Sequence, residues 1–135
     1  MSMLNKLQGA LVASCQPIDN GPMDQPQIVA AMALAAQAGG AAGLRIEGID
    51  NLRAVRAVCD LPIVGILKRD LQASAVRITP LIEDVVQLAQ AGADIIAYDA
   101  TFRVRPVSTL ELIDKIHSCR CLAMADCATF SEAKM

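Results

Sequence analysis

IVGILKRD, residues 63–70, is the stretch that decides the fold predicted for this chain of 135 residues. Its first five residues are apolar, a proline precedes them, and two cations and a carboxylate end the stretch. A short, uninterrupted apolar run is typical of a strand that is buried on both faces of a parallel sheet. Parallel α/β proteins carry their chemistry at the carboxyl ends of such strands. Lys68 therefore stands where a functional side chain is expected.

Similar strand–helix units repeat along the chain. We expect strands at residues 10–14, 41–46, 63–67, 95–98 and 121–125. We expect helices at residues 27–37, at 51–58 with Asp50 as the cap, at 81–90, from a Ser108 cap through 118, and from 130 onward. No hairpin turn joins two consecutive strands, so this alternation predicts a parallel sheet with right-handed crossovers.

Two architectures fit such an alternation, a (β/α) barrel and an open, doubly wound sheet. The first strand–helix turn lacks a GxGxxG motif, which argues against a dinucleotide-binding sheet. Polar residues follow every predicted strand, whereas a doubly wound sheet concentrates them at one switch point. A complete barrel has eight units and roughly 250 residues. We therefore predict an α/β fold with a partial (β/α)8 TIM barrel of about five βα units, as a single domain over residues 1–135.

Composition and charge narrow the function classes. The net charge of −2 and the pI near 5.2 argue against a surface for nucleic acid or anionic membranes. No apolar run approaches the roughly 20 residues of a membrane span, and no secretory signal pattern is visible. The five cysteines lack the spacing of a disulfide framework and are expected to be reduced. These features indicate a cytoplasmic protein.

One polar residue near the carboxyl end of each predicted strand forms the candidate site. The five are Gln16, Arg45, Lys68, Asp99 and Asp126. In a barrel these side chains converge on one mouth and suit a small, polar, anionic substrate. An apolar surrounding and the neighbouring Arg69 would favour the neutral form of the Lys68 amine, which can take up and return a proton. The alternative is that charged residues follow strands only because strands end at the surface.

For the histidine and for three of the cysteines, a structural role is preferred over catalysis or metal binding. His117, the one histidine, lies late in a predicted helix and suits a C-terminal charge partner better than a catalyst. Cys15 lies nearest the predicted mouth, and packing is favoured over a nucleophilic role. Cys119 and Cys121, with His117 nearby, lack the second ligand pair that a zinc site needs.

Seven short motifs, in this order, resemble the N-acetylmannosamine-6-phosphate 2-epimerase family. They are VASCQ (12–16), AMALA (31–35), LRIEG (44–48), GILKRD (65–70), ITP (78–80), DIIAYDAT (94–101) and MAD (124–126). The similarity extends over nearly the whole chain and places it among ribulose-phosphate-binding-type TIM barrels. The resemblance implies an isomerase of amino-sugar and sialic acid breakdown that interconverts N-acetylmannosamine 6-phosphate and N-acetylglucosamine 6-phosphate, without a metal or redox cofactor.

The resemblance also implies roles for individual residues. Lys68 matches the catalytic lysine, which removes a proton from C2 of the ring-opened sugar, α to the C1 carbonyl. Gln16, Arg45 and Asp126 match substrate-contacting positions, and Asp99 lies at the same mouth. The family's second acid/base, a glutamate before Gly-Arg, has no counterpart here, because Glu47-Gly48 belongs to the motif of the second strand. The glycine-rich phosphate loops of the late strands have no counterpart either.

Two hypotheses follow from these matches and departures. In the first, the chain is an epimerase that uses Lys68, cut short relative to its family. In the second, it is a catalytically inactive half-barrel whose unpaired sheet edges favour a homodimer or aggregation.

Overall fold

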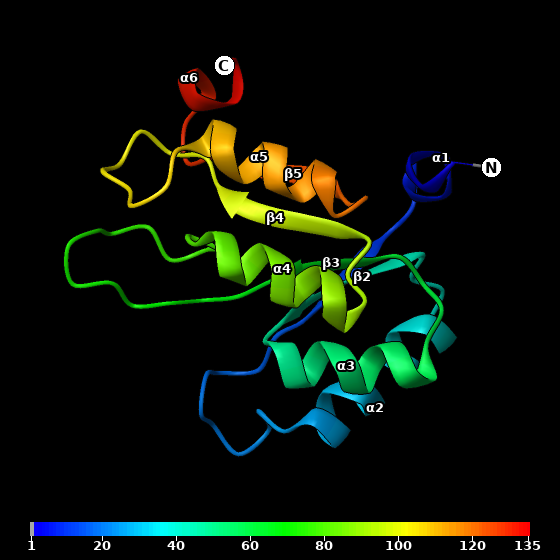
Figure 1. Ribbon diagram of the computed structural model, residues 1–135. Helices are drawn as coiled ribbons and strands as arrows, with labels where there is room; N and C mark the ends of the chain where they lie inside the picture. The colour runs from blue at the N-terminus through cyan, green and yellow to red at the C-terminus, as the bar shows by residue number, and fades with distance from the viewer. Residues whose placement is uncertain (1) are drawn as a thin grey trace.

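The computed structural model describes residues 2–135 as one parallel sheet with helices packed along it (Figure 1). The strands are β1 (Val12–Cys15), β2 (Gly43–Glu47), β3 (Ile63–Ile66), β4 (Ile95–Asp99) and β5 (Leu122–Asp126). The helices are α1 (Met3–Leu7), α2 (Pro26–Ala38), α3 (Ile49–Val58), α4 (Ile82–Ala91), α5 (Thr109–Ser118) and α6 (Phe130–Ala133). The five strands lie side by side in chain order, and every pair is parallel.

The strand order distinguishes between the two predicted architectures. Each strand lies next to the one before it, so every crossover moves one position in the same direction. Right-handed crossovers of this kind put all the connecting helices on one face. Neighbouring helices from α2 to α5 accordingly contact one another in sequence along the sheet (Figure 1). The arrangement is that of a barrel wall, as predicted, and not of a doubly wound sheet.

Successive strand side chains point to opposite faces of the sheet, so the apolar residues form two layers. One residue set points to the helices and forms the larger core, which includes the fully buried Leu44, Ile63 and Ile96. The other set lies on the opposite, inner face of the sheet, where Val64, Ile66, Ile95 and Ala97 are buried. Met3 and Leu7 of α1 cover this inner layer, together with Ile78 and Met124. Because barrel strands bury both faces, β3 and β4 are buried at every position.

The predicted element boundaries are correct to within one or two residues, with one wrong cap. Ser108 caps α5 as expected, since its hydroxyl accepts a hydrogen bond from the Glu111 N–H. Asp50 does not cap α3, because that helix begins one residue earlier, at Ile49, and its N-cap is Gly48. Gly48 takes this position with a φ of 90°, a backbone conformation that glycine adopts without strain.

The connection between β3 and α4 is long but ordered (Figure 1). The second half of this connection runs back to the sheet, where Ile78 forms an isolated antiparallel β-bridge with Lys68. The Thr79 N–H donates to the Leu67 carbonyl at 2.8 Å, and the Asp99 N–H donates to the Ile78 carbonyl at 3.0 Å. Strands β3 and β4 pair directly at Val64 with Ile95 and at Gly65 with Ile96, and beyond these pairs the returning segment lies between their carboxyl ends.

Within residues 2–135, β1 pairs only with β2, and β5 pairs only with β4. The sheet thus has two free edges. In the same range, no helix has both the length and the apolar character needed to cross a membrane.

Candidate active site

The register of the sheet places all five predicted site residues at the alternate positions whose side chains point to the inner face. Ser14, Arg45, Val64, Ile95 and Leu122 form one row across the strands, through successive pairings. Two positions further along each strand lie Gln16, Glu47, Ile66, Ala97 and Met124. Lys68, Asp99 and Asp126 stand in the next position of their strands, at the carboxyl edge. Side chains two residues apart share a face of a sheet, so the five residues line one mouth.

Lys68 is held tightly by its backbone. Its N–H donates to Oε2 of Glu47 at 3.0 Å, and its other side pairs with Ile78. Its side chain is about one quarter exposed, and the amine lies 3.9 Å from Oδ1 of Asp19. The amine is thus on the rim of the mouth, within reach of solvent and of a small molecule.

Arg69 pairs with a carboxylate of α4. Its guanidinium lies 2.6 Å from Oδ1 of Asp84, whose side chain is completely buried. Neighbouring residues on an extended segment point to opposite faces, so Arg69 turns toward α4 while Lys68 stays at the mouth. The anion Asp19 lies 3.9 Å from the Lys68 amine, and the same carboxylate also faces Arg77 at 3.7 Å.

Arg45 and Asp126 are brought together across the inner face. The guanidinium donates two hydrogen bonds to the carboxylate, at 3.2 Å and 2.5 Å, and also lies 3.8 Å from the Met124 sulfur. Arg45 comes from β2 and Asp126 from β5, so the sheet curves enough for one side chain to reach past two intervening strands. A bidentate pair fixes both groups in one geometry.

Asp99 is bound by its own loop. Its Oδ1 accepts hydrogen bonds from the Thr101 N–H at 2.8 Å, from the Thr101 hydroxyl at 2.7 Å and from Arg105 at 3.1 Å. Arg103 lies 3.5 Å from Oδ2. Burial alone would raise the pKa of Asp99, but the bonds from Thr101 and Arg105 outweigh it and lower that pKa. This carboxylate is therefore charged at neutral pH, and it orders the loop after β4.

Gln16 and Cys15 lie at the end of β1. The Gln16 amide donates to the Ser14 hydroxyl at 2.7 Å and is partly exposed. Cys15 points the other way, into the helix-side core, with only 5% of its surface exposed. Burial raises the pKa of the Cys15 thiol, with a smaller contribution from Cys59, so the packing interpretation is supported.

Three charged residues at the mouth were missed from the sequence. Asp19 lies in the proline-rich loop after β1 and faces both Lys68 and, at 3.7 Å, Arg77. Glu47 follows Arg45 by two positions and therefore shares its face. Burial raises the pKa of Glu47, an effect that the hydrogen bond from the Lys68 N–H opposes. Strand alternation would have found Glu47, whereas nothing local marks Asp19 or Arg77.

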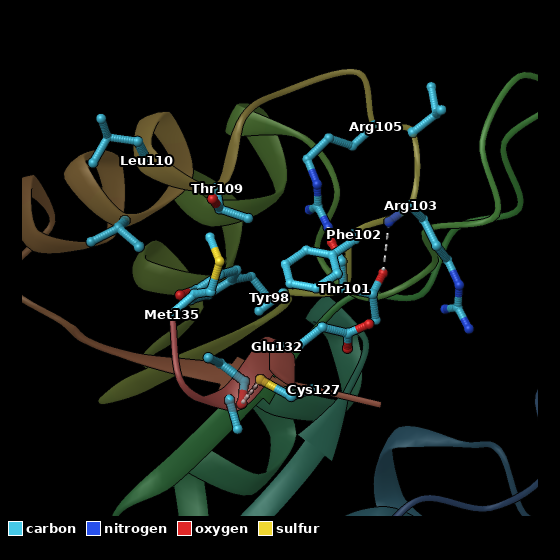
Figure 2. A pocket seen from close by; sticks show the side chains of 15 residues that line it. Tyr98, Thr101, Phe102, Arg103, Arg105, Thr109, Leu110, Cys127, Glu132 and Met135 are labelled. Atoms are coloured by element: carbon cyan, nitrogen blue, oxygen red, sulfur yellow. Dashed lines mark hydrogen bonds between the residues drawn. The ribbon is translucent and has the colours of Figure 1, made fainter. Parts of the chain in front are cut away.

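A sizeable cavity lies away from this mouth. It has a volume of about 630 Å³ and lies between the end of β4, α5 and α6 (Figure 2). Tyr98 and Leu110 line it with Arg103 and Arg105 at one side (Figure 2). Tyr98 belongs to the strand residues that face the helices, so this cavity opens behind the sheet and not into the mouth. Lys68, Arg45 and Asp126 are not among its lining residues.

Known proteins match the chain over almost its whole length. Residues 29–135 match the family model NanE, described as "Putative N-acetylmannosamine-6-phosphate epimerase". A relative from Photobacterium profundum, with the curated name "Putative N-acetylmannosamine-6-phosphate 2-epimerase", is 66% identical over 129 residues. That alignment covers 96% of this chain and 55% of the relative. A relative of the same name from Pasteurella multocida is 59% identical over 130 residues, which cover 96% of this chain and 57% of the relative.

A solved structure agrees with these relatives. It is the N-acetylmannosamine-6-phosphate 2-epimerase from Clostridium perfringens, with a TM-score of 0.94 and 38% sequence identity. The superposition covers 98% of this chain and 58% of that one. The chain thus spans a little over half the length of the proteins that it matches. The agreement confirms the predicted fold class, in which the five βα units form part of a TIM barrel wall.

Proposed function

The chain belongs to the N-acetylmannosamine-6-phosphate epimerase family, and from this premise we propose that its mouth binds an amino-sugar phosphate and exchanges the proton at C2. The observation that carries the proposal is the position of Lys68. Its amine stands at the carboxyl end of β3, on the inner face, in a sheet that superimposes closely on a solved epimerase. The full reaction would interconvert N-acetylmannosamine 6-phosphate and N-acetylglucosamine 6-phosphate.

Lys68 is the proposed acid/base. The hydrogen at C2 of the open-chain sugar is acidic because it lies α to the C1 carbonyl, which takes the electron pair as an enolate. The neutral amine takes that proton and becomes an ammonium, and the reverse transfer restores the C–H bond. Asp19 lies 3.9 Å from the amine, and substrate would replace this weak contact.

The other predicted residues are proposed to hold the substrate. Arg45 and Asp126 present a bidentate pair whose outer edges can accept and donate hydrogen bonds to sugar hydroxyls. Gln16 has an amide on the same face, bonded to the Ser14 hydroxyl, which a sugar hydroxyl can replace. For Asp99 a direct contact is harder, because Oδ1 is already bonded by Thr101 and Arg105. Its contribution would be through Oδ2, which lies 3.5 Å from Arg103.

Inversion at C2 requires that one proton is removed from one face of C2 and that another proton is delivered to the opposite face of the planar enolate. Lys68 approaches from one face only, so a second donor is needed on the other. We propose that this chain forms the N-terminal part of the barrel, as one domain, and by itself catalyses C2 exchange more readily than complete epimerisation. The inactive half-barrel is the competing account, and the two differ in whether C2 exchange occurs.

The assembly and location are proposed on physical grounds. The edges of β1 and β5 are unpaired within residues 2–135, and apolar side chains such as Val12 and Leu122 are 37% exposed along them. Edges of this kind pair readily with another chain, so we propose a homodimer. The small negative net charge fits a cytoplasmic metabolic enzyme and offers no basic surface for nucleic acid.

Deuterium exchange tests the activity directly. The chain is incubated with N-acetylmannosamine 6-phosphate in D2O, and the C2 proton signal is followed by NMR. We expect this signal to disappear with the wild-type chain and to persist with Lys68→Ala, whose circular dichroism spectrum should be unchanged. A folded wild-type chain that leaves C2 unlabelled would support the inactive half-barrel instead.

A further inference from the structure

The hydrogen bond between the Glu47 carboxylate and the Lys68 N–H takes the place of the next backbone hydrogen bond that the β2–β3 ladder would have made. The Gly48 N–H donates to the Ile66 carbonyl at 3.0 Å, the last backbone bond between β2 and β3. At Gly48 the chain turns away into α3, so β2 offers no carbonyl opposite the next N–H of the neighbouring segment, that of Lys68. The Glu47 carboxylate fills this place and accepts that N–H at 3.0 Å.

The backbone of Lys68 is thereby held from both sides. On the far side, the Thr79 N–H donates to the Leu67 carbonyl and the Arg69 N–H donates to the Arg77 carbonyl, at 2.8 Å and 2.9 Å. These two bonds flank the bridge between Lys68 and Ile78. On the near side, Glu47 is the only described group that bonds the Lys68 N–H. On the β2 side, the position of the Lys68 backbone therefore depends on this one carboxylate.

Glu47 itself is anchored by a nearly buried amide. Asn51, with 8% of its surface exposed, donates from Nδ2 to the Glu47 carbonyl at 3.2 Å and to Oδ1 of Asp24 at 3.0 Å. The first turn of α3 thus fixes the residue whose side chain fixes Lys68. The same amide holds the loop that carries Asp19, the anion nearest the amine.

A carboxylate at this position is costly for the fold. Burial raises the pKa of Glu47, and the nearby Asp19 and Asp24 add to that rise, so the charged form is less stable here than in the unfolded chain. Sites where a residue costs stability are often functional ones. An amide oxygen could accept the same N–H without a charge, so the geometry and the charge can be separated by substitution.

We propose that Glu47 is a positioning residue that sets the direction of the Lys68 amine by holding its backbone N–H, an inference that rests on the proposed C2 exchange. Glu47 acts through Lys68 and does not itself take the proton. Misplacement of a catalytic group by about 1 Å can lower a rate by about 100-fold. Removal of the acceptor should therefore lower turnover far more than it weakens substrate binding.

The test compares Glu47→Ala with Glu47→Gln. We expect Glu47→Ala to lower the saturating rate of C2 exchange about 10- to 100-fold, with KM changed less than about threefold. Glu47→Gln should retain the rate within about threefold, because its amide oxygen accepts the Lys68 N–H. Amide hydrogen exchange of Lys68, followed by NMR, should accelerate in Glu47→Ala and stay slow in Glu47→Gln.

Asp94→Ala is the matched control. Asp94 accepts the Ile63 N–H at 2.9 Å, at the opposite end of the same strand. It should lose stability yet keep the wild-type rate per folded molecule and the slow exchange of the Lys68 amide. The proposal is overturned if Glu47→Ala keeps the wild-type rate, or if Glu47→Gln is as impaired as Glu47→Ala. If the wild-type chain exchanges no C2 proton, the proposed function fails separately, and an unchanged Lys68 amide in Glu47→Ala then overturns the positioning role.

Discussion

At the scale of single residues, Arg45 and Asp126 combine a structural and a binding role. Their side chains are 24% and 29% exposed, so the pair is neither fully solvated nor fully buried. Asp126→Ala leaves the Arg45 guanidinium without its carboxylate in a partly desolvated place. We expect a loss of about 1–3 kcal/mol in the free energy of unfolding, between the values for exposed and buried pairs. Urea unfolding of Asp126→Ala, Arg45→Ala and the double variant measures the coupling between the two side chains. Losses that simply add would contradict a stabilising pair.

The lowered pKa of Asp99 predicts how the stability of the fold changes in acid. Its pKa is lowered in the folded chain, because hydrogen bonds from Thr101 and Arg105 outweigh the effect of burial. A carboxyl with a lowered folded pKa stabilises the fold above its unfolded value, near 3.9, and this contribution disappears as the pH falls toward the folded value. Asp99→Asn should therefore be less stable than wild type at pH 7, and the difference should shrink below pH 4. Asp114→Asn, at an exposed carboxylate of α5, is the control for the loss of one negative charge, against which the Asp99→Asn difference is measured.

At the scale of elements, the packing between β3 and its helices leaves no space for an added methyl group. A Cβ at Gly65 would lie 2.8 Å from a Leu52 methyl and 2.9 Å from the Ala93 Cβ. Gly65→Ala should thus cost about 1–3 kcal/mol in unfolding free energy. Gly39→Ala is the control, because its Cβ would meet nothing closer than 3.5 Å and its φ is −79°. Equal midpoints for the two variants in chemical unfolding would contradict the tight packing of β3.

The sequence was informative about elements and less so about contacts. Apolar runs bounded by proline or glycine located the strands, because strand burial and turn chemistry are local properties. Alternation places the side chains of Lys68 and Arg69 on opposite faces, which the prediction that Arg69 acts on the Lys68 amine overlooked. Which charge lies beside the amine depends on a distant loop. Asp19 is 49 positions before Lys68, and no spacing rule connects them. The Gly48 cap was missed because a polar residue, Asp50, offered the stronger local signal.

At the scale of the whole molecule, the free edges are the main liability. The β1 and β5 edges carry Val12 and Leu122, each 37% exposed. If these edges mediate the proposed homodimer, Val12→Lys or Leu122→Lys should shift the chain toward a monomer, because an edge lysine disfavours pairing. Size-exclusion chromatography with light scattering gives the mass directly. A wild-type chain that is a stable monomer at high concentration would contradict the homodimer.

The central claim is that Lys68 moves the C2 proton of an amino-sugar phosphate. The most direct measurement is the rate at which the C2 proton of N-acetylmannosamine 6-phosphate is replaced in D2O, with the C3 proton of the same molecule as the internal reference. The account predicts loss of the C2 signal alone, at a rate proportional to the concentration of wild-type chain, and no loss with folded Lys68→Ala. Equal rates with the two chains, or no exchange with a folded wild-type chain, would contradict it.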